Sequence, residues 1–445
     1  MSIGAPKCGV TIFHGDLNTL RGGQWKLQGQ DIPVVESYTY LGIETNSNWD
    51  LSKLVVAVSN KARRALWSLR PALGNPMIPL AVKAQMIKSL VVPVAAFGGE
   101  LLGMVKERAK SNQRIVDQGL KWALAGDISK GTVVAAATAR AEFGLTTLHA
   151  TWSSRRTRGW VKFRQLKTWI STLVSNPFKH RKNTWVSGTS RWLKRMGATQ
   201  LVEGKPSKKA ASAVLKLVEG KETEGDKTES LASYRRWKLG RSEHYLKKSL
   251  RHPGLALGVR WLARLRTKSF WTGPRAAHAK LVPAWWGSMC PSCEGKLKED
   301  IPHILLECPL HNEARCRLIQ PVVGWATGTI SAPSREELAM VLLGGQVGRV
   351  DLSKQWLGEA KHNPCGEKAP FLRVAEYLQE IMPSRMRNLW GDQIPQGAFE
   401  EVDTVVLPRN FLVQPSQLEI VIPLVPVPRS RSPIGYGSSS RAGAD

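Results

Sequence analysis

The chain has 445 residues, enough for about three domains on a length prior of roughly 150 residues each, and its 42% hydrophobic content is sufficient for buried cores. Lysine and arginine number 64 against 35 aspartates and glutamates, which gives a net charge of +29. Because such an excess destabilises a compact fold unless a polyanion screens it, we expect nucleic acid as the first partner and an anionic membrane surface as the second. No run of about 18 apolar residues occurs, which argues against a transmembrane segment.

Residues 1–48 predict short extended pieces. Two β-prone runs lie at residues 10–13 and 38–43, and Gly42 interrupts the second. A glycine inside a strand marks a bulge or the close approach of another backbone. No leading element is present to pair with the first strand, so we expect that the chain begins in the middle of a domain.

Residues 49–150 predict a helical domain. Between residues 51 and 69, apolar side chains recur every three or four positions, which indicates one amphipathic helix. A second helix follows from about residue 79 and is expected to kink or end near Pro93. Two further helices are predicted before residue 150.

Residues 151–200 contain no aspartate or glutamate, and tryptophans alternate there with basic residues. Basic side chains neutralise phosphates and indole faces stack on bases, so this alternation suits a single strand or a hybrid duplex. Alternatively, the tryptophans belong to the core of an amphipathic helix pair and the charges are solvated; the surface is electropositive on either interpretation. The basic residues expected to contact nucleic acid are Arg155, Arg156, Arg158, Lys162, Arg164, Lys167, Lys179, Arg181 and Lys182.

The segment 151–265 is therefore predicted to be a basic, tryptophan-rich helical connector. Within it, residues 199–233 are poor in aromatics, and the stretch Leu-Val-Glu-Gly-Lys at 201–205 returns at 217–221. Such a duplication is tolerated in an exposed linker, which we expect here. Beyond residue 330, helices are predicted over 331–392. The Pro-, Ser- and Gly-rich tail at 393–445 is predicted to be disordered.

A cysteine and histidine cluster lies within residues 266–330. Cys290, Cys293, His303 and Cys308 spell C-x2-C-x9-H-x4-C, which supplies the four ligands of a tetrahedral structural Zn²⁺ site. On an ideal helix the last two would lie about 140° apart around the axis. Pro309 pushes the residue before it out of the helical region, so we expect Cys308 to sit past the helix end and to turn back toward the metal.

A second pair, His311 and Cys316, repeats the H-x4-C spacing and remains an alternative to His303 and Cys308. The apolar residues 304–306 favour the first pair because they can pack a small module. A closed site with four protein ligands indicates scaffolding or recognition and not metal catalysis. Four of the six cysteines lie within residues 290–316, and the six are not spread as a disulfide framework, so a reducing intracellular compartment, nucleus or cytoplasm, is expected.

No catalytic residue is predicted from the motifs. The sequence contains no Gly-rich phosphate loop, no G-x-S-x-G elbow and no H-E-x-x-H zinc motif. It also lacks an adjacent Asp-Asp pair that would hold two Mg²⁺ ions for nucleotidyl transfer.

Five separate stretches, in this order, resemble the carboxy-terminal half of a non-LTR retrotransposon reverse transcriptase, over roughly residues 5–345. They are Lys7-Cys-Gly-Val10, the Y-T-Y-L-G-I run at 38–43, residues 93–103, Leu265-Arg-Thr-Lys268 and the CCHC run. The resemblance implies a primer-grip hairpin at the end of the palm, a helical thumb and then a zinc module. It places Lys7 near the phosphates of the incoming nucleotide. It also places Tyr40, Leu41 and Gly42 against the primer terminus.

The departures from the family define the expected activity. Phe97 and Leu102 replace the commoner Tyr and Trp, and the metal-binding F/Y-x-D-D of the family precedes the lysine stretch with which this chain begins. We therefore expect a fragment that holds template RNA or primer–template duplex without polymerising, with Mg²⁺ bound only if a catalytic palm lies upstream. Two alternatives remain: part of an active RNA-directed DNA polymerase truncated by gene prediction, or an unrelated zinc-dependent interaction module.

Overall fold

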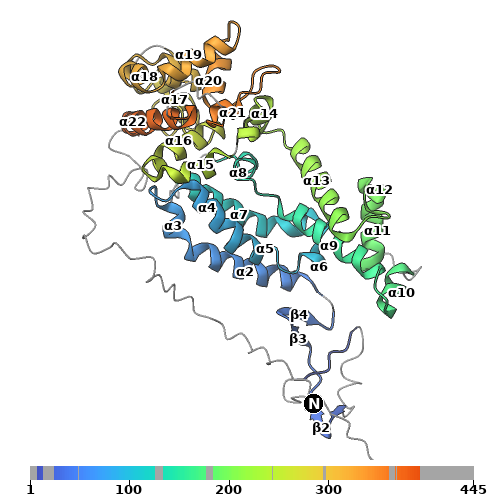
Figure 1. The fold of residues 1–445 in the computed structure, drawn as a ribbon. Helices are drawn as coiled ribbons and strands as arrows, with labels where there is room; N and C mark the ends of the chain where they lie inside the picture. The colour runs from blue at the N-terminus through green and yellow to red at the C-terminus, as the bar shows by residue number, and fades with distance from the viewer. Residues whose placement is uncertain are drawn as a thin grey trace, which may run out of the picture. The chain divides into compact units, whose positions relative to one another are not determined.

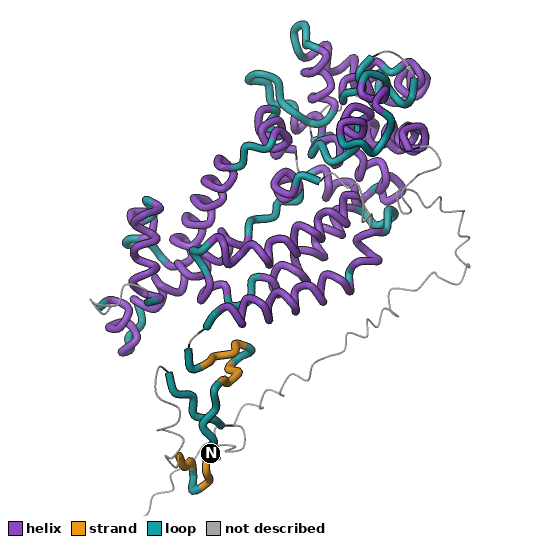
Figure 2. Tube along the Cα trace, turned by 180° about the vertical axis from the view of Figure 1, so that it is seen from behind, coloured by secondary structure: helices purple, strands orange, loops and turns teal. Residues whose placement is uncertain are grey.

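Helices dominate the chain, and the strands occupy residues 25–46 in the part that the structure describes (Figures 1 and 2). The structure is a computed structural model. It describes residues 8–13, 25–48, 50–125, 134–176, 184–242, 244–293, 297–359, 366 and 368–390. The predicted fold class, mainly helical with a small N-terminal β element, is confirmed. The tail at 393–445 lies outside the described residues.

Two short antiparallel hairpins form the β element. They comprise β1 (Trp25–Leu27) with β2 (Gln30–Ile32) and β3 (Ser37–Tyr40) with β4 (Ile43–Asn46). In the second, Tyr40 pairs with Ile43, so Leu41 and Gly42 form a two-residue turn. Both have positive φ, +50° and +78°, which the tightest hairpin turns require. The break expected at Gly42 is therefore the turn of a hairpin.

The helices that follow begin with α2 (Ser52–Ser68), α3 (Arg70–Gly74), α4 (Leu80–Met86), the π-helical turn η2 (Ile87–Val91), α5 (Val92–Ala95), α6 (Gly99–Leu102), α7 (Lys106–Ala125), α8 (Ala136–Glu142) and α9 (Leu148–Arg164). The expected stripe on α2 is buried at Leu54, Val58 and Leu66. The helix changes to a π-helical turn just before Pro93 and ends at Ala95, close to the predicted position. The Val92 N–H donates to the carbonyl of Ile87, and this wider turn carries the helix past the proline.

The segment predicted as a linker at 199–233 is helical, so that prediction is wrong. This segment consists of α12 (Thr199–Val202), α13 (Ser207–Gly225) and the start of α14 (Glu229–Arg236). The helices α10 (Trp169–Ser175) and α11 (Trp185–Met196) precede it. Helix α13 packs along α9. It buries Ala210, Val214 and Val218, which recur every four residues on one face. The prediction was wrong because it relied on the low aromatic content and overlooked this stripe of small apolar side chains.

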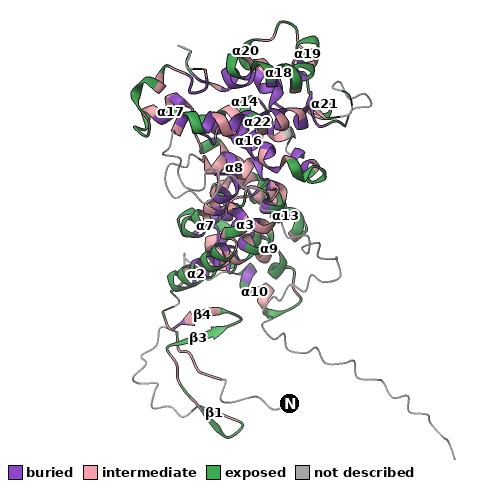
Figure 3. Cartoon of the chain, turned by 90° about the vertical axis from the view of Figure 1, so that its left-hand side faces the viewer, coloured by how far each residue is buried: buried purple, intermediate pink, exposed green. Residues whose placement is uncertain are grey.

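The remaining elements are η3 (Leu239–Ser242), α15 (Tyr245–Lys248), η4 (Ser249–Arg251), η5 (Pro253–Leu255), α16 (Ala256–Arg266), α17 (Gly273–His278), η6 (Ala284–Gly287), the π-helical turn η7 (His303–Glu307), η8 (Pro309–His311), α18 (Asn312–Leu318), α19 (Gln320–Thr329), α20 (Arg335–Leu342), α21 (Ser353–Trp356) and α22 (Pro370–Trp390). Helices α16 and α22 pack together with extensively buried faces (Figure 3). None of the described helices combines the length and the apolar composition that a membrane crossing requires.

One hydrophobic core joins most of these helices. It contains Leu54 of α2, Trp152 of α9, Leu262 of α16, Ile304 of η7 and Leu378 of α22. The described residues, from 8 to 390, accordingly belong to one compact unit. The predicted boundaries at 150, 265 and 330 therefore separate parts of a shared core and not independently folded domains.

Candidate metal centre and basic surface

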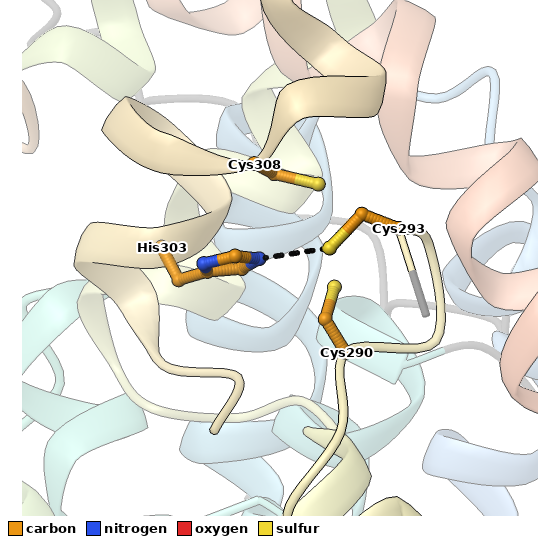
Figure 4. Close-up of side chains that lie close together, drawn as sticks. All are labelled: Cys290, Cys293, His303 and Cys308. Atoms are coloured by element: carbon orange, nitrogen blue, oxygen red, sulfur yellow. Dashed lines mark hydrogen bonds between the residues drawn. The ribbon is translucent and has the colours of Figure 1, made fainter. Parts of the chain in front are cut away.

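The four predicted metal ligands lie together (Figure 4). The ligand atoms of Cys290, Cys293, His303 and Cys308 are all within 4.8 Å of one another. Three of the four residues are buried and Cys293 is half-buried. The structure thus brings residues of one turn and one short helical segment to a single point.

A π-helical turn explains how His303 and Cys308 meet. The Cys308 N–H donates to the carbonyl of His303 at 2.8 Å, so the chain closes a turn over five residues. This wider turn returns Cys308 above His303, where an α-helix would have rotated it away. Before Pro309, Cys308 has an extended backbone with ψ of 118°, as the sequence predicted. The turn and the proline together aim both side chains at the site.

The distance between Cys293 and His303 fits a zinc ion. With Zn–S near 2.3 Å and Zn–N near 2.0–2.1 Å, a tetrahedral shell separates sulfur from nitrogen by about 3.6 Å. The Cys293 Sγ lies 3.6 Å from the His303 Nε2. Four protein ligands complete the shell, so the site suits a structural ion that cross-links the chain and leaves no position for a substrate.

The thiols are prepared for metal binding by their surroundings. A hydrogen bond from the Cys308 thiol lowers the pKa of Cys290 to about 5, against the effect of burial, and the N–H groups of Cys293 and Ser292 add to it. The same hydrogen bond, with burial, raises the pKa of the Cys308 thiol. Cys290 therefore offers a thiolate, and a divalent cation would replace the proton that Cys308 shares with it.

Charged residues surround His303 and fix its backbone. The Asp300 Oδ1 accepts the His303 N–H at 2.8 Å. Arg335, from α20, donates to Asp300 at 3.1 Å and to both oxygens of Glu307 at 2.6 Å. Glu307 lies 3.8 Å from the His303 Nδ1, beyond hydrogen-bond distance but placed to orient an imidazole that binds metal through Nε2. Arg335 was missed from the sequence because it is distant along the chain.

The alternative ligands lie differently. The His311 Nε2 is 3.2 Å from the Ser292 Oγ. Burial, with the charges of Arg315 and Arg385, lowers the pKa of His311 to about 4. Cys316 is exposed, with its Sγ 3.9 Å from the Asn312 Oδ1. The geometry therefore favours His303 and Cys308 as the ligands.

Buried polar contacts join the metal centre to the neighbouring helices. Arg385 of α22 donates to both oxygens of Glu299 at 2.5 and 2.7 Å, and both side chains are fully buried. Arg315 donates to the carbonyl of Cys308 at 2.7 Å. The Tyr377 hydroxyl donates to the carbonyl of Ile304 at 2.8 Å. Loss of the centre would therefore disturb α18 and α22 as well.

The basic residues predicted to contact nucleic acid fall into two groups. Lys7, Lys179, Arg181 and Lys182 lie outside the described residues. Among the described ones, the exposed residues on α9 and the turn after it are Arg155, Arg158, Lys162, Arg164 and Lys167. Arg164 stacks on Trp160, with its guanidinium carbon 4.6 Å from the ring centre. These positions form a cationic surface along α9, which we call the α9 surface.

Arg156 belongs to the core and not to this surface. Its guanidinium donates to the Thr189 hydroxyl at 2.9 Å and to the carbonyls of Leu101, Gly103 and Trp185 at 3.1, 3.2 and 2.9 Å. It thereby holds α9 to α11 and to the end of α6. Burial and then the charge of Arg108 lower the pKa of Arg156 to about 10. Its hydrogen bonds to carbonyls and a hydroxyl leave its positive charge unneutralised.

The tryptophans divide between core and surface. Trp152 and Trp192 are buried, Trp160 and Trp185 are half-buried, and Trp169 is 71% exposed. The hairpin residues Tyr40 and Leu41 are also exposed, by 65% and 77%. The tip of the β3–β4 hairpin is thus open to solvent, with Gly42 in its turn.

Comparison with known proteins adds no assignment. No protein-family model matches the chain, and no curated protein or solved structure matches it. The features that bear on function are therefore the four ligands of the metal centre and the charge of α9 and α11.

Proposed function

We propose that this chain binds nucleic acid, and that it holds template RNA or a primer–template duplex by the phosphodiester backbone. The observation that carries the proposal is the acid-free segment 151–200, whose described part lies mainly on α9, α10 and α11. The order of motifs further suggests a carboxy-terminal part of a non-LTR retrotransposon reverse transcriptase. Such a role places the protein in a reducing compartment, the nucleus or the cytoplasm.

The α9 surface differs from an ordinary solvated helix face. Ordinary faces mix both signs of charge, which limits their repulsion. Here Arg158, Lys162 and Lys167 are exposed on a segment without a single carboxylate of its own. A polyanion would release counterions on binding and relieve this repulsion, so the surface suits a phosphate backbone.

The proposal assigns a supporting role to zinc. Bound by Cys290, Cys293, His303 and Cys308, the ion would supply a cross-link between the Cys290–Cys293 turn and the helical segment η7. Arg385, Arg315 and Tyr377 transmit that cross-link to α22 and α18 through the contacts described above. The metal centre would thus stabilise the helical body and take no part in chemistry on the nucleic acid.

The proposal is limited to binding. The sequence offers no adjacent aspartate pair that would hold two Mg²⁺ ions. The exposed Tyr40 and Leu41 are placed by the family resemblance against a primer end, which is a positioning role. Polymerisation by a longer protein that contains this chain is a separate proposal and needs an upstream Asp pair.

A salt titration tests the proposal. With the full chain in its zinc-bound form, we expect the logarithm of the affinity for a single-stranded RNA oligonucleotide to fall by about 0.7–0.9 per phosphate contacted for each unit of log salt. The variant Arg158→Gln, Lys162→Gln, Arg164→Gln should reduce that slope by about 2, since three cations are removed.

The matched control removes three exposed lysines of α13, in Lys208→Gln, Lys209→Gln, Lys216→Gln. It changes the net charge equally and should leave the slope within about 0.5 of the unchanged protein. An affinity that stays flat between low and high salt, or the absence of RNA binding at low salt, would contradict the proposed function.

A further inference from the structure

A cavity of about 670 Å³ lies beside the α9 surface, between the loop that joins α6 to α7, the start of α7, the helix α9 and the helix α11. Figure 1 shows these helices together around α9. The charged side chains that line it are all cationic: Arg108, Arg156, Arg191, Lys194 and Arg195. Among the residues that the structure describes, none that lines the cavity carries a carboxylate.

The cations occupy two levels. Arg156 is buried, with its hydrogen bonds made to protein carbonyls and a hydroxyl, so its position is fixed. Arg108, Lys194 and Arg195 are exposed at the opening, on α7 and α11. After burial, the charge of Arg108 is the second cause of the lowered pKa of Arg156, as expected for two like charges that line one cavity. An anion placed between them would reverse that repulsion into attraction.

Helix α11 lines the cavity along its length, from Thr184 and Gly188 at its first turn to Lys194 and Arg195 at its last. The loop wall is closely packed at Gly103, because a Cβ atom there would lie only 2.7 Å from the carbonyl oxygen of Trp152. Part of the cavity wall is therefore packed backbone, and the wall does not consist of surface side chains alone.

We propose that this cavity binds a phosphate group of the nucleic acid and thereby fixes the register of the strand that the α9 surface attracts. The inference rests on the proposed function and deepens it. Arginine guanidinium groups match phosphate oxygens in a two-pronged geometry, and lysines add point charge. The cavity volume lies within the range of pockets that hold small ligands, so it accommodates a phosphate with its attached sugar.

The experiment compares two triple variants of the full, zinc-bound chain. The first removes the charges at the opening, in Arg108→Gln, Lys194→Gln, Arg195→Gln. The second is the α13 control, Lys208→Gln, Lys209→Gln, Lys216→Gln. Inorganic phosphate and pyrophosphate serve as competitors, and the probes are RNA oligonucleotides with a 5′-phosphate or a 5′-hydroxyl. Thermal unfolding by circular dichroism checks that both variants fold, as expected for exposed positions.

If the cavity binds phosphate, the first variant loses at least about tenfold in RNA affinity and about 2 in salt slope, and the control loses neither. Pyrophosphate should compete with RNA for binding to the unchanged protein. It should no longer compete with RNA for binding to the first variant. A preference for the 5′-phosphorylated strand that disappears in the first variant identifies a terminal phosphate. Equal binding of both strands, with the slope still reduced, identifies an internal phosphodiester.

Three results overturn the inference. If both variants lose RNA affinity and salt slope equally, the attraction is diffuse. The proposed function then stands, but the cavity is not a phosphate site. Weakened binding to phosphatidylserine vesicles with RNA binding intact assigns the cavity to a membrane surface. Absence of RNA binding by the unchanged protein removes both the proposed function and this inference.

Discussion

The metal centre and the α9 surface differ in whether carboxylates lie next to their buried arginines. Beside the metal centre, Arg385 is fully buried and faces the equally buried carboxylate of Glu299. In the adjoining core, Arg266 faces Glu142 at 2.6 Å, again with both side chains fully buried. Near the α9 surface, the buried Arg156 donates to carbonyls and a hydroxyl and lies over the ring of Trp185, and no carboxylate is among the described residues that line the cavity.

Beside the metal centre the buried charges are paired within the chain, whereas the cavity beside α11 is the place where we propose that an external anion binds. A buried charge is tolerated when an opposite charge and further hydrogen bonds compensate its lost hydration. Glu142 shows such completeness, because the hydroxyls of Tyr234 and Tyr245 and the guanidinium of Arg266 all donate to it. No carboxylate is among the described residues that line the cavity beside α11, and the anion that we propose there would supply the compensating charge. The predictions below probe that contrast, from the largest expected change in stability to the smallest.

Removal of the metal should have the largest effect. Cys308→Ala, or treatment with a zinc chelator, should cost on the order of 10 kcal/mol of folding free energy, because the ion provides the link between the two ligand segments. Zinc content per chain and thermal unfolding measure the outcome. Cys316→Ala is the control, since its thiol is exposed, and it should retain both zinc and melting temperature. A Cys308→Ala protein that keeps its zinc would reject this ligand set.

Loss of the buried ion pair should come next. Glu299→Gln leaves Arg385 charged and without its partner in the core, and we expect a cost of about 3–5 kcal/mol. The control is Glu380→Gln, which breaks the exposed pair between Arg317 of α18 and Glu380 of α22. Glu380 lies on the same helix as Arg385. That change should cost less than about 1 kcal/mol. Urea denaturation measures both, and equal costs would show that burial does not decide the strength of these pairs.

Glu222 of α13 should give a smaller, pH-dependent effect. Although burial would raise its pKa, hydrogen bonds from His149 and Thr147 lower the pKa of Glu222 from 4.5 to about 2. Its stabilisation is therefore complete above pH 4.5 and is lost as the pH falls toward 2. Glu222→Gln should cost about 2 kcal/mol at pH 6, after allowance for partial exposure.

The difference between Glu222→Gln and the unchanged protein should shrink steadily below pH 4.5 in urea denaturation. Glu224→Gln, at an exposed position on the same helix, is the control and should change stability by less than about 0.5 kcal/mol at either pH. A cost for Glu222→Gln that is constant from pH 6 to pH 3 would rule out this carboxylate as the source.

The exposed Trp169 should change stability least. Trp169→Ala is expected to alter the unfolding free energy by less than about 0.5 kcal/mol, because the side chain is 71% exposed. Trp192→Ala, at a buried position on α11, should cost about 3–5 kcal/mol. If Trp169 stacks on a base, its removal should still weaken single-stranded RNA binding by about 1–3 kcal/mol. An unchanged RNA affinity would assign the α9 surface a purely electrostatic role.

The candidate metal centre shows how far local sequence reaches. The C-x2-C spacing and Pro309 act over a few residues, so the convergence of Cys290 with Cys293 and the extended backbone of Cys308 were predictable. The π-helical turn over His303–Glu307 was not, because an α-helix and a π-helix share the same apolar pattern. Arg335 and Arg385 were also unpredictable as neighbours, since they approach from α20 and α22 through tertiary packing.

The sequence by itself determined the net charge, the acid-free stretch at 151–200 and the kinds of ligand available, because these are properties of composition and short spacing. Only the tertiary structure decided that 207–225 is a packed helix, that Arg156 is buried, and that Arg108 of α7 joins Lys194 and Arg195 of α11 around one cavity. Burial and neighbourhood arise from contacts between segments far apart in the chain, and no local pattern encodes which segments meet.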